Sequence, residues 1–312
     1  MINFKSKKAD LTANQIITII ILIVSFAVIL LFFFMLNLKG NIDAESCRNS
    51  VVMRSSLLGG TATVQLQCKT QEVCIYKSGD CANMGKDAIK IKVASKDELL
   101  DALGDRIYNC HWQMGEGKMD FLPPNFGFTS NYCAICDTIY FDEGIKNDDT
   151  LNKIPVRDLY TFLKVKKAPD GVNSLLFNMY GVNSLDSISV QDKSGQKVDL
   201  LSQTYDFSRK EGYVLVTSMA KSGWGGTLLA ATGGVVVGAL AIGLSPVTAG
   251  TSLAAGAAII TGAGLVGGGI TGGVGFYVSG PGDTVYMPPS LYLNTAKIVD
   301  EQIKCNDFTT LA

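Results

Sequence analysis

The hydrophobic and polar positions divide the chain into two long uncharged stretches with a mixed segment between them. The stretch from Ile16 to Leu38 carries no charge. At about 1.5 Å per helical residue it is long enough to cross a hydrocarbon layer of roughly 30 Å. The second stretch, from Ser222 to Gly282, is also uncharged. The pattern predicts a leader at 1–15, a transmembrane anchor at 16–38, a soluble domain at 39–221, an apolar hairpin at 222–282 and a tail at 283–312.

The second stretch is rich in glycine and alanine, and its length suits two helical spans at 226–245 and 253–278 with a turn near Pro246. Glycines recur four residues apart, which allows close helix packing. The glycines predicted to pack are Gly234, Gly238, Gly264, Gly268 and Gly272. Three interpretations stay open: a permanent transmembrane hairpin, a segment that inserts conditionally or packs between subunits, and a buried element of a soluble core.

The segment between the two stretches alternates helical and strand patterns. Ser95 and Glu98 form a capping box, and the apolar positions that follow recur at helical spacing, which predicts an amphipathic helix at 96–113. Pro155 opens a second predicted helix. Short alternating runs before, between and after these helices predict strands, for example at 131–141. The expected fold class is an α+β ectodomain with an N-terminal transmembrane helix and a glycine-rich helical hairpin inserted near the C-terminus.

All eight cysteines follow the first apolar stretch. They are Cys47, Cys68, Cys74, Cys81, Cys110, Cys133, Cys136 and Cys305. An even set on one side of a predicted membrane span indicates disulfides in an oxidising compartment, although eight cysteines allow 105 complete pairings. The alternative is that several of them are free buried thiols.

Few residues in the sequence suggest catalytic or metal-binding chemistry. Cys133 and Cys136 have the CxxC spacing of thiol oxidoreductases, but the strand pattern around them disfavours that activity. A zinc site would need Cys74 and Cys81 beside that pair, and structural disulfides are the preferred interpretation. His111 is the single histidine, so histidine-based metal and hydrolase sites have little to work with. We therefore predict no catalytic residues, no metal and no cofactor, with thiol–disulfide exchange as the minor enzymatic alternative.

A glycine-rich run at 262–267 formally matches a dinucleotide fingerprint, but too little chain follows it to complete a nucleotide-binding domain. The net charge is −1, from 27 basic and 28 acidic residues. There is no basic field for nucleic acid, so a nucleic-acid partner is not expected.

The leader is basic, with three lysines before the first apolar stretch, which favours a cytoplasmic N-terminus and an extracytoplasmic main domain. The motif Lys8-Ala9-Asp10-Leu11 resembles the site that archaeal prepilin peptidases cleave, which would place processing between Ala9 and Asp10. Asn14 stands at the fifth position after that site, where many pilins carry glutamate.

The helix end Asn109-Cys-His-Trp-Gln-Met-Gly-Glu-Gly-Lys118 and the strand Tyr132-Cys-Ala-Ile-Cys136 follow the predicted anchor. This combination resembles uncharacterised membrane-anchored, cysteine-containing surface proteins of small-genome archaea. The resemblance implies no activity and assigns no functional residue.

These patterns together predict a membrane-anchored surface or envelope protein that acts as a structural or interaction module. One alternative is a membrane-active protein whose glycine-rich hairpin oligomerises or inserts to form a pore. A third is a pilin-like filament or secretion subunit. The expected partners are the lipid bilayer and other proteins, including copies of this chain joined through the glycine-rich segment.

Overall fold

The computed structural model describes residues 13–35, 39–56, 65–79, 81, 84–85, 87–122, 131–185, 190–191, 197–198, 200–221, 258–260, 265–266, 269–270, 275–279, 284–294 and 307–309. The chain divides into two compact units, Met1–Ile42 and Asp43–Ala312. Each unit is considered by itself.

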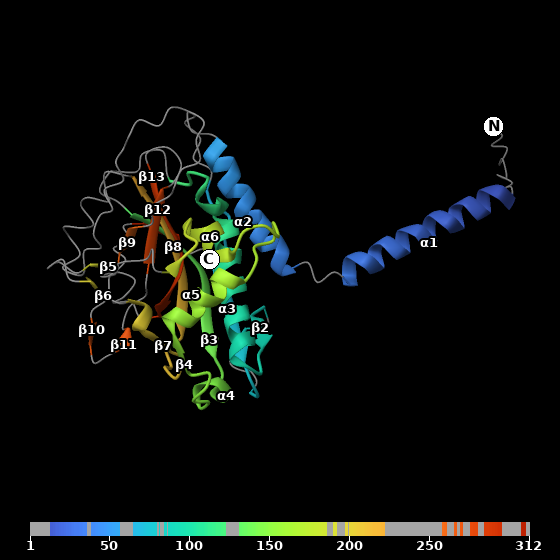
Figure 1. The fold of residues 1–312 in the computed structure, drawn as a ribbon. Helices are drawn as coiled ribbons and strands as arrows, with labels where there is room; N and C mark the ends of the chain where they lie inside the picture. Colours follow the sequence, from blue (N-terminus) through green and yellow to red (C-terminus); the bar gives the residue numbers. More distant parts are fainter. Residues whose placement is uncertain are drawn as a thin grey trace, which may run out of the picture. The chain divides into compact units, whose positions relative to one another are not determined.

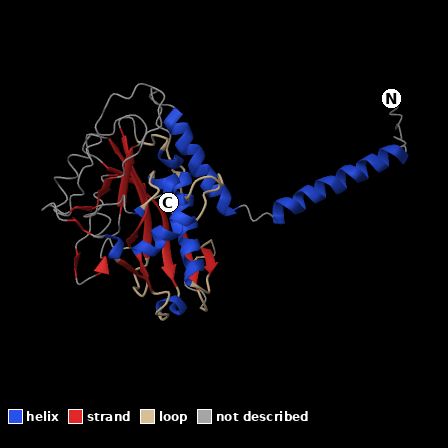
Figure 2. Ribbon diagram, in the orientation of Figure 1, coloured by secondary structure: helices blue, strands red, loops and turns tan. Residues whose placement is uncertain are grey.

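The second unit is a mixed α+β domain built on one large sheet (Figures 1 and 2). The strands of this sheet are β1 (Gln71–Tyr76), β2 (Ile89–Lys92), β3 (Asn131–Phe141), β8 (Tyr213–Lys221), β9 (Ala258–Ile260), β12 (Gly275–Ser279), β13 (Thr284–Leu293) and β14 (Asp307–Thr309). Their order is β2-β1-β3-β8-β13-β12-β9, and β14 pairs with β3 beside that path. Strands β2, β1 and β3 run parallel, whereas the pairs from β3 through β8 and β13 to β12 and β9 are antiparallel.

Shorter elements complete the unit. The helices are α2 (Lys39–Ser56), α3 (Lys96–Gln113), α4 (Glu143–Lys146), α5 (Val156–Val165) and α6 (Leu175–Tyr180). The small strand pairs are β4 (Lys153–Pro155) with β7 (Thr204–Asp206), β5 (Val190–Gln191) with β6 (Lys197–Val198), and β10 (Leu265–Val266) with β11 (Gly269–Ile270). Helices α3, α5 and α6 cover one face of the large sheet (Figure 2).

Helix α3 confirms the predicted amphipathic helix at 96–113. Ser95 has extended backbone angles, and its side chain accepts a hydrogen bond from the Glu98 amide, as the capping box requires. Leu99, Leu103 and Ile107 are at most 2% exposed, so the apolar stripe forms the core contact with the sheet. The mixed α+β class of the domain is therefore correct.

The membrane-spanning part of the predicted fold is corrected. Within the described part of the chain, no helix combines the length and the apolar character needed to cross a membrane. The segment predicted as an anchor at 16–38 contributes to α1 (Ala13–Met35).

The predicted helical hairpin at 222–282 is also wrong wherever the structure describes it. The pieces described between residues 258 and 279 are the strands β9, β10, β11 and β12, and β12 pairs with the edge of β13. Glycine weakens a helix by about 1 kcal/mol relative to alanine, and β-branched and aromatic residues such as Phe276, Tyr277 and Val278 favour strands. The packing glycines Gly234, Gly238, Gly264, Gly268 and Gly272, and the leader residues Ala9 and Asp10, lie outside the described residues.

Candidate functional site

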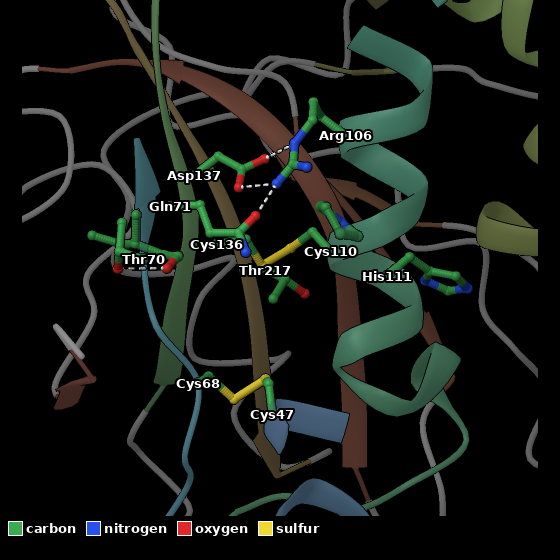
Figure 3. Close-up of a disulfide and its surroundings, with 12 residues drawn as sticks. Cys47, Cys68, Thr70, Gln71, Arg106, Cys110, His111, Cys136, Asp137 and Thr217 are labelled. Carbon is green, nitrogen blue, oxygen red and sulfur yellow. Dashed lines mark hydrogen bonds and ion pairs between the residues drawn. A yellow bond between two sulfur atoms is a disulfide. The ribbon is translucent and has the colours of Figure 1, made fainter. Parts of the chain in front are cut away.

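Helix α3 is fastened to strand β3 by a disulfide and an ion pair that lie side by side (Figure 3). Cys110 is bonded to Cys136. One helical turn earlier, Arg106 donates two hydrogen bonds to Asp137, at 2.8 Å from Nε and 2.6 Å from Nη2. The same Nη2 donates to Gln71 of β1 at 2.6 Å. Two neighbouring residues of β3 therefore both reach α3.

A β-bulge explains how consecutive residues of one strand reach the same helix. Side chains normally alternate between the two faces of a strand. The pairing of β3 with β8 shifts between Ile135 and Asp137, which leaves Cys136 as the extra residue. A bulge of this kind re-aims a side chain locally. It lets Cys136 and Asp137 face α3 together.

The Arg106–Asp137 pair is enclosed in the core. Asp137 is 1% exposed and Arg106 is 8% exposed. Burial raises the pKa of the Asp137 carboxyl, and the guanidinium of Arg106 opposes that rise. The bidentate geometry satisfies both carboxylate oxygens, which is the condition under which a buried charge is tolerated.

Two further disulfides fasten the surrounding segments. Cys47 of α2 is bonded to Cys68, in the extended segment before β1. Cys74 of β1 is bonded to Cys81 in the following loop. Cys133 is also disulfide-bonded, and the eighth candidate, Cys305, lies outside the described residues. The predicted disulfides are thus confirmed, and no described cysteine is a free thiol.

His111 is buried on the other side of α3 from the ion pair. Its Nδ1 lies 3.2 Å from the Tyr286 hydroxyl, and its Nε2 has no hydrogen-bond partner among the described residues. The residue is 1% exposed, and burial lowers the imidazole pKa from 6.5 to about 3. The ring is therefore neutral over the physiological range. This agrees with the structural role that a single enclosed histidine suggests.

A left-handed turn follows the helix. Gly115, Glu116 and Gly117 have φ angles of 75°, 59° and 66°, and Glu116 is the only non-glycine residue with positive φ in the described part of the chain. Lys118 Nζ donates to the Glu116 carboxylate at 2.7 Å, and Arg48 of α2 lies 3.7 Å from it. Burial raises the pKa of this carboxyl, but the hydrogen bond and the two cations outweigh burial and lower it overall.

The turn is pressed against Tyr286. A Cβ built on Gly117 would lie 2.6 Å from Cδ1 of the tyrosine ring, and the positive φ itself strains an L-residue. We expect Gly117→Ala to lower the free energy of unfolding by about 2–4 kcal/mol, because it adds a steric contact to the backbone strain. Denaturant unfolding followed by circular dichroism measures the change.

Gly171 provides the matched control. Its φ is 69°, close to that of Gly117, but a Cβ there would meet nothing within 4 Å. Gly171→Ala should lower the free energy of unfolding only through backbone strain, by about 1 kcal/mol. Equal losses in the two variants would show that Tyr286 does not hold the turn in place.

A pocket opens where β1 and β3 end. Its volume is about 460 Å³, which lies within the range of small-ligand sites. The lining residues are Glu72, Cys74, Gly79, Cys81, Met84, Gly85, Tyr140, Phe141, Asp142, Glu143 and Lys146. The Cys74–Cys81 disulfide therefore forms part of its wall.

Asp142 ties the loop after β1 to the start of α4, beside this pocket. Its carboxylate accepts hydrogen bonds from the backbone amides of Lys77, Gly79 and Ile145 at 3.1, 2.7 and 2.9 Å. Burial raises the pKa of Asp142, but the backbone hydrogen bonds outweigh it, so the net shift is downward. The loop after β1 and the start of α4 are both held by one ionised side chain, which preforms this side of the pocket.

The disulfides separate the four cysteines that were considered for a zinc site. Cys136 is bonded to Cys110 instead of Cys133, and Cys74 is bonded to Cys81, so the four cysteines considered for zinc do not form one set. No group of three potential metal ligands occurs among the described residues.

Sequence reasoning missed Arg106, Asp137 and Asp142. The signal for the first two was a charged residue inside an apolar pattern: Arg106 lies between Leu103 and Cys110 on the core stripe, and Asp137 interrupts an apolar strand. Such a residue is buried only when paired, which points to a partner of opposite sign.

No protein-family model, curated protein or solved structure matches this chain.

Proposed function

We propose that residues from Asp43 onward form a disulfide-braced domain that works outside the cytoplasm as an interaction module of the cell surface or envelope. The observation that carries the proposal is the complete pairing of the cysteines described. Cys47, Cys68, Cys74, Cys81, Cys110 and Cys136 are each at most 6% exposed and each is bonded. Such buried disulfides form and persist in oxidising compartments and are rare in a reducing cytosol.

The chemistry of the core supports binding over catalysis. The single histidine is enclosed, and its pKa is strongly lowered. The buried charges of Arg106 and Asp137 neutralise each other in an ion pair. The CxxC cysteines are not bonded to each other, since Cys136 is joined to α3. One solvent-facing feature with a defined shape is the preformed pocket beside the loop after β1 that Asp142 holds. A rigid frame with a preformed recess suits recognition of a partner.

Location and thiol state test the proposal together. Intact cells that make the protein are treated with a membrane-impermeant amine-reactive biotin, and a cytoplasmic protein serves as the lysis control. We expect biotin on this chain without lysis, and no titratable thiol after denaturation without reductant. Labelling that requires lysis, or several free thiols in the purified protein, would make the proposal wrong.

A further inference from the structure

We propose that the pocket at the carboxyl ends of β1 and β3 binds a lysine or arginine side chain presented by a peptide segment of a partner protein. This inference rests on the proposed function and names the chemistry of its ligand. Strand β1 presents alternate residues to the core and to the pocket. Val73 and Ile75 are fully buried in the core, so Glu72 and Cys74 point to the opposite face of the sheet.

The pocket wall on that face has an aromatic and apolar part. Tyr140 is in register with Cys74 across the parallel β1–β3 pair, and both line the pocket. Met84 and the Cys74–Cys81 disulfide add apolar surface. Such a wall accommodates the methylene stem of a long basic side chain, and a tyrosine ring attracts a cation over its face.

The charges that line the pocket favour a cation. Among the lining residues that the structure describes, three carboxylates, those of Glu72, Asp142 and Glu143, are accompanied by one ammonium group, that of Lys146. Asp142 is satisfied by backbone amides, and Lys146 Nζ lies 3.0 Å from Glu143. The Glu72 side chain makes no hydrogen bond or ion pair with any residue that the structure describes. It is the carboxylate left available for an incoming cation.

The size of the recess selects the class of ligand. A volume of about 460 Å³ exceeds what one basic side chain fills, so it leaves room for the neighbouring backbone. An amino-acid side chain with its flanking peptide fits this requirement, and the preformed loops reduce the ordering cost on binding.

The test uses the full-length oxidised protein and short capped peptides. The probes are acetyl-Gly-Lys-Gly-amide and acetyl-Gly-Arg-Gly-amide, with the Gln and Glu counterparts as comparison peptides. Binding is followed by chemical-shift changes in titrations at low ionic strength. We expect the basic peptides to bind and the neutral and acidic peptides to bind at least threefold more weakly, with affinity falling as salt is added.

Three substitutions sharpen the result. Glu72→Gln should weaken binding of the lysine peptide about three- to tenfold. Lys146→Gln should strengthen it, because the change removes the competing ammonium beside Glu143. Glu45→Gln is the matched control: Glu45 is an exposed residue of α2 outside the pocket lining, and its loss changes the net charge by the same amount.

Several results would overturn the inference. Equal binding of the lysine and glutamine peptides, the same loss in Glu72→Gln and Glu45→Gln, or no binding by the folded protein would each do so. Shift changes that map away from Tyr140 and the loop after β1 would also do so. None of these outcomes alters the labelling result from intact cells, so failure of the ligand assignment is distinguishable from failure of the proposed location.

Discussion

Replacement of Arg106 by methionine should lower the free energy of unfolding by about 3–5 kcal/mol at neutral pH. The change removes the guanidinium that donates to both oxygens of Asp137 and leaves that carboxylate 1% exposed without its counter-charge. Methionine keeps most of the side-chain length, so the loss is mainly electrostatic. Denaturant unfolding at fixed pH measures it.

The loss should shrink in acid. Burial already raises the Asp137 pKa, and the substitution removes the guanidinium that opposes that rise. The folded variant then binds a proton more readily than the unfolded chain does, so falling pH favours its folded state. We expect the difference between Arg106→Met and the unchanged protein to be smaller at pH 4.5 than at pH 7.

Two further variants separate charge burial from lost packing. Arg106→Met combined with Asp137→Leu should recover most of the stability, because both charges leave together. Lys166→Met is the surface control: Lys166 pairs with Asp101 and Asp105, whose side chains are 55% and 62% exposed, and its loss should cost less than about 1 kcal/mol. A double variant as unstable as the single one would show that Arg106 acts through packing.

Helix α3 and its buried ion pair show which parts of the fold the sequence could predict. Helix α3 was predictable because its cap and its apolar stripe are local signals: Ser95 and Glu98 lie three residues apart, and Leu99, Leu103 and Ile107 repeat every four. The pairing of Arg106 with Asp137 depends on a β-bulge and on the register of β3 with β8, which join residues far apart in the chain. Single-sequence periodicity does not carry that information.

In the glycine-rich region the sequence pattern predicted helices where the structure has strands. Lack of charge is a strong signal for burial, but it does not say whether the apolar surroundings are lipid or protein. Strand β12 is placed by the exposed edge of β13, a tertiary contact that overrides a pattern first interpreted as helical. Helix α2 was missed because its buried side carries the small residues Ala44, Cys47 and Ser50 beside Val51, and most of the helix is polar.

The pocket could be anticipated only in part. The cysteines of its wall were predicted to form disulfides, but their pairing was open among many combinations. Asp142 follows an apolar strand and precedes a four-residue helix, a position that suits a helix cap. Its role in tying the loop after β1 depends on the parallel pairing of β1 with β3, which brings both strand ends to one edge.

His111 should make the stability of this protein depend on pH in a window where few other side chains titrate. Its pKa is 6.5 in the unfolded chain and about 3 in the folded protein, and the chain has no other histidine. Between these values the unfolded state binds a proton that the folded state does not. The free energy of unfolding should therefore fall as the pH decreases from 6.5, by up to about 1.4 kcal/mol per pH unit.

The groups that face the imidazole determine this shift. Burial is the largest cause, and it lowers the pKa. The Glu116 carboxylate opposes it, whereas the cations Lys118 and Arg48 add to it. The Tyr286 hydroxyl at 3.2 Å and the Tyr108 ring at 6.3 Å remain neutral in this range, since burial raises both phenol pKa values. The enclosure of the ring therefore dominates the electrostatics.

Denaturant unfolding at pH 7, 6 and 5 tests the expectation, because aspartate and glutamate side chains titrate mainly below that interval. His111→Gln should remove most of the slope there, since glutamine gains no charge in either state. Should that variant fail to fold, the imidazole proton resonances of the unchanged protein provide the second measurement. They should show no protonation step between pH 7.5 and 5 while the protein stays folded. A normal step near pH 6.5 would mean that solvent reaches His111 and that the ring is not enclosed.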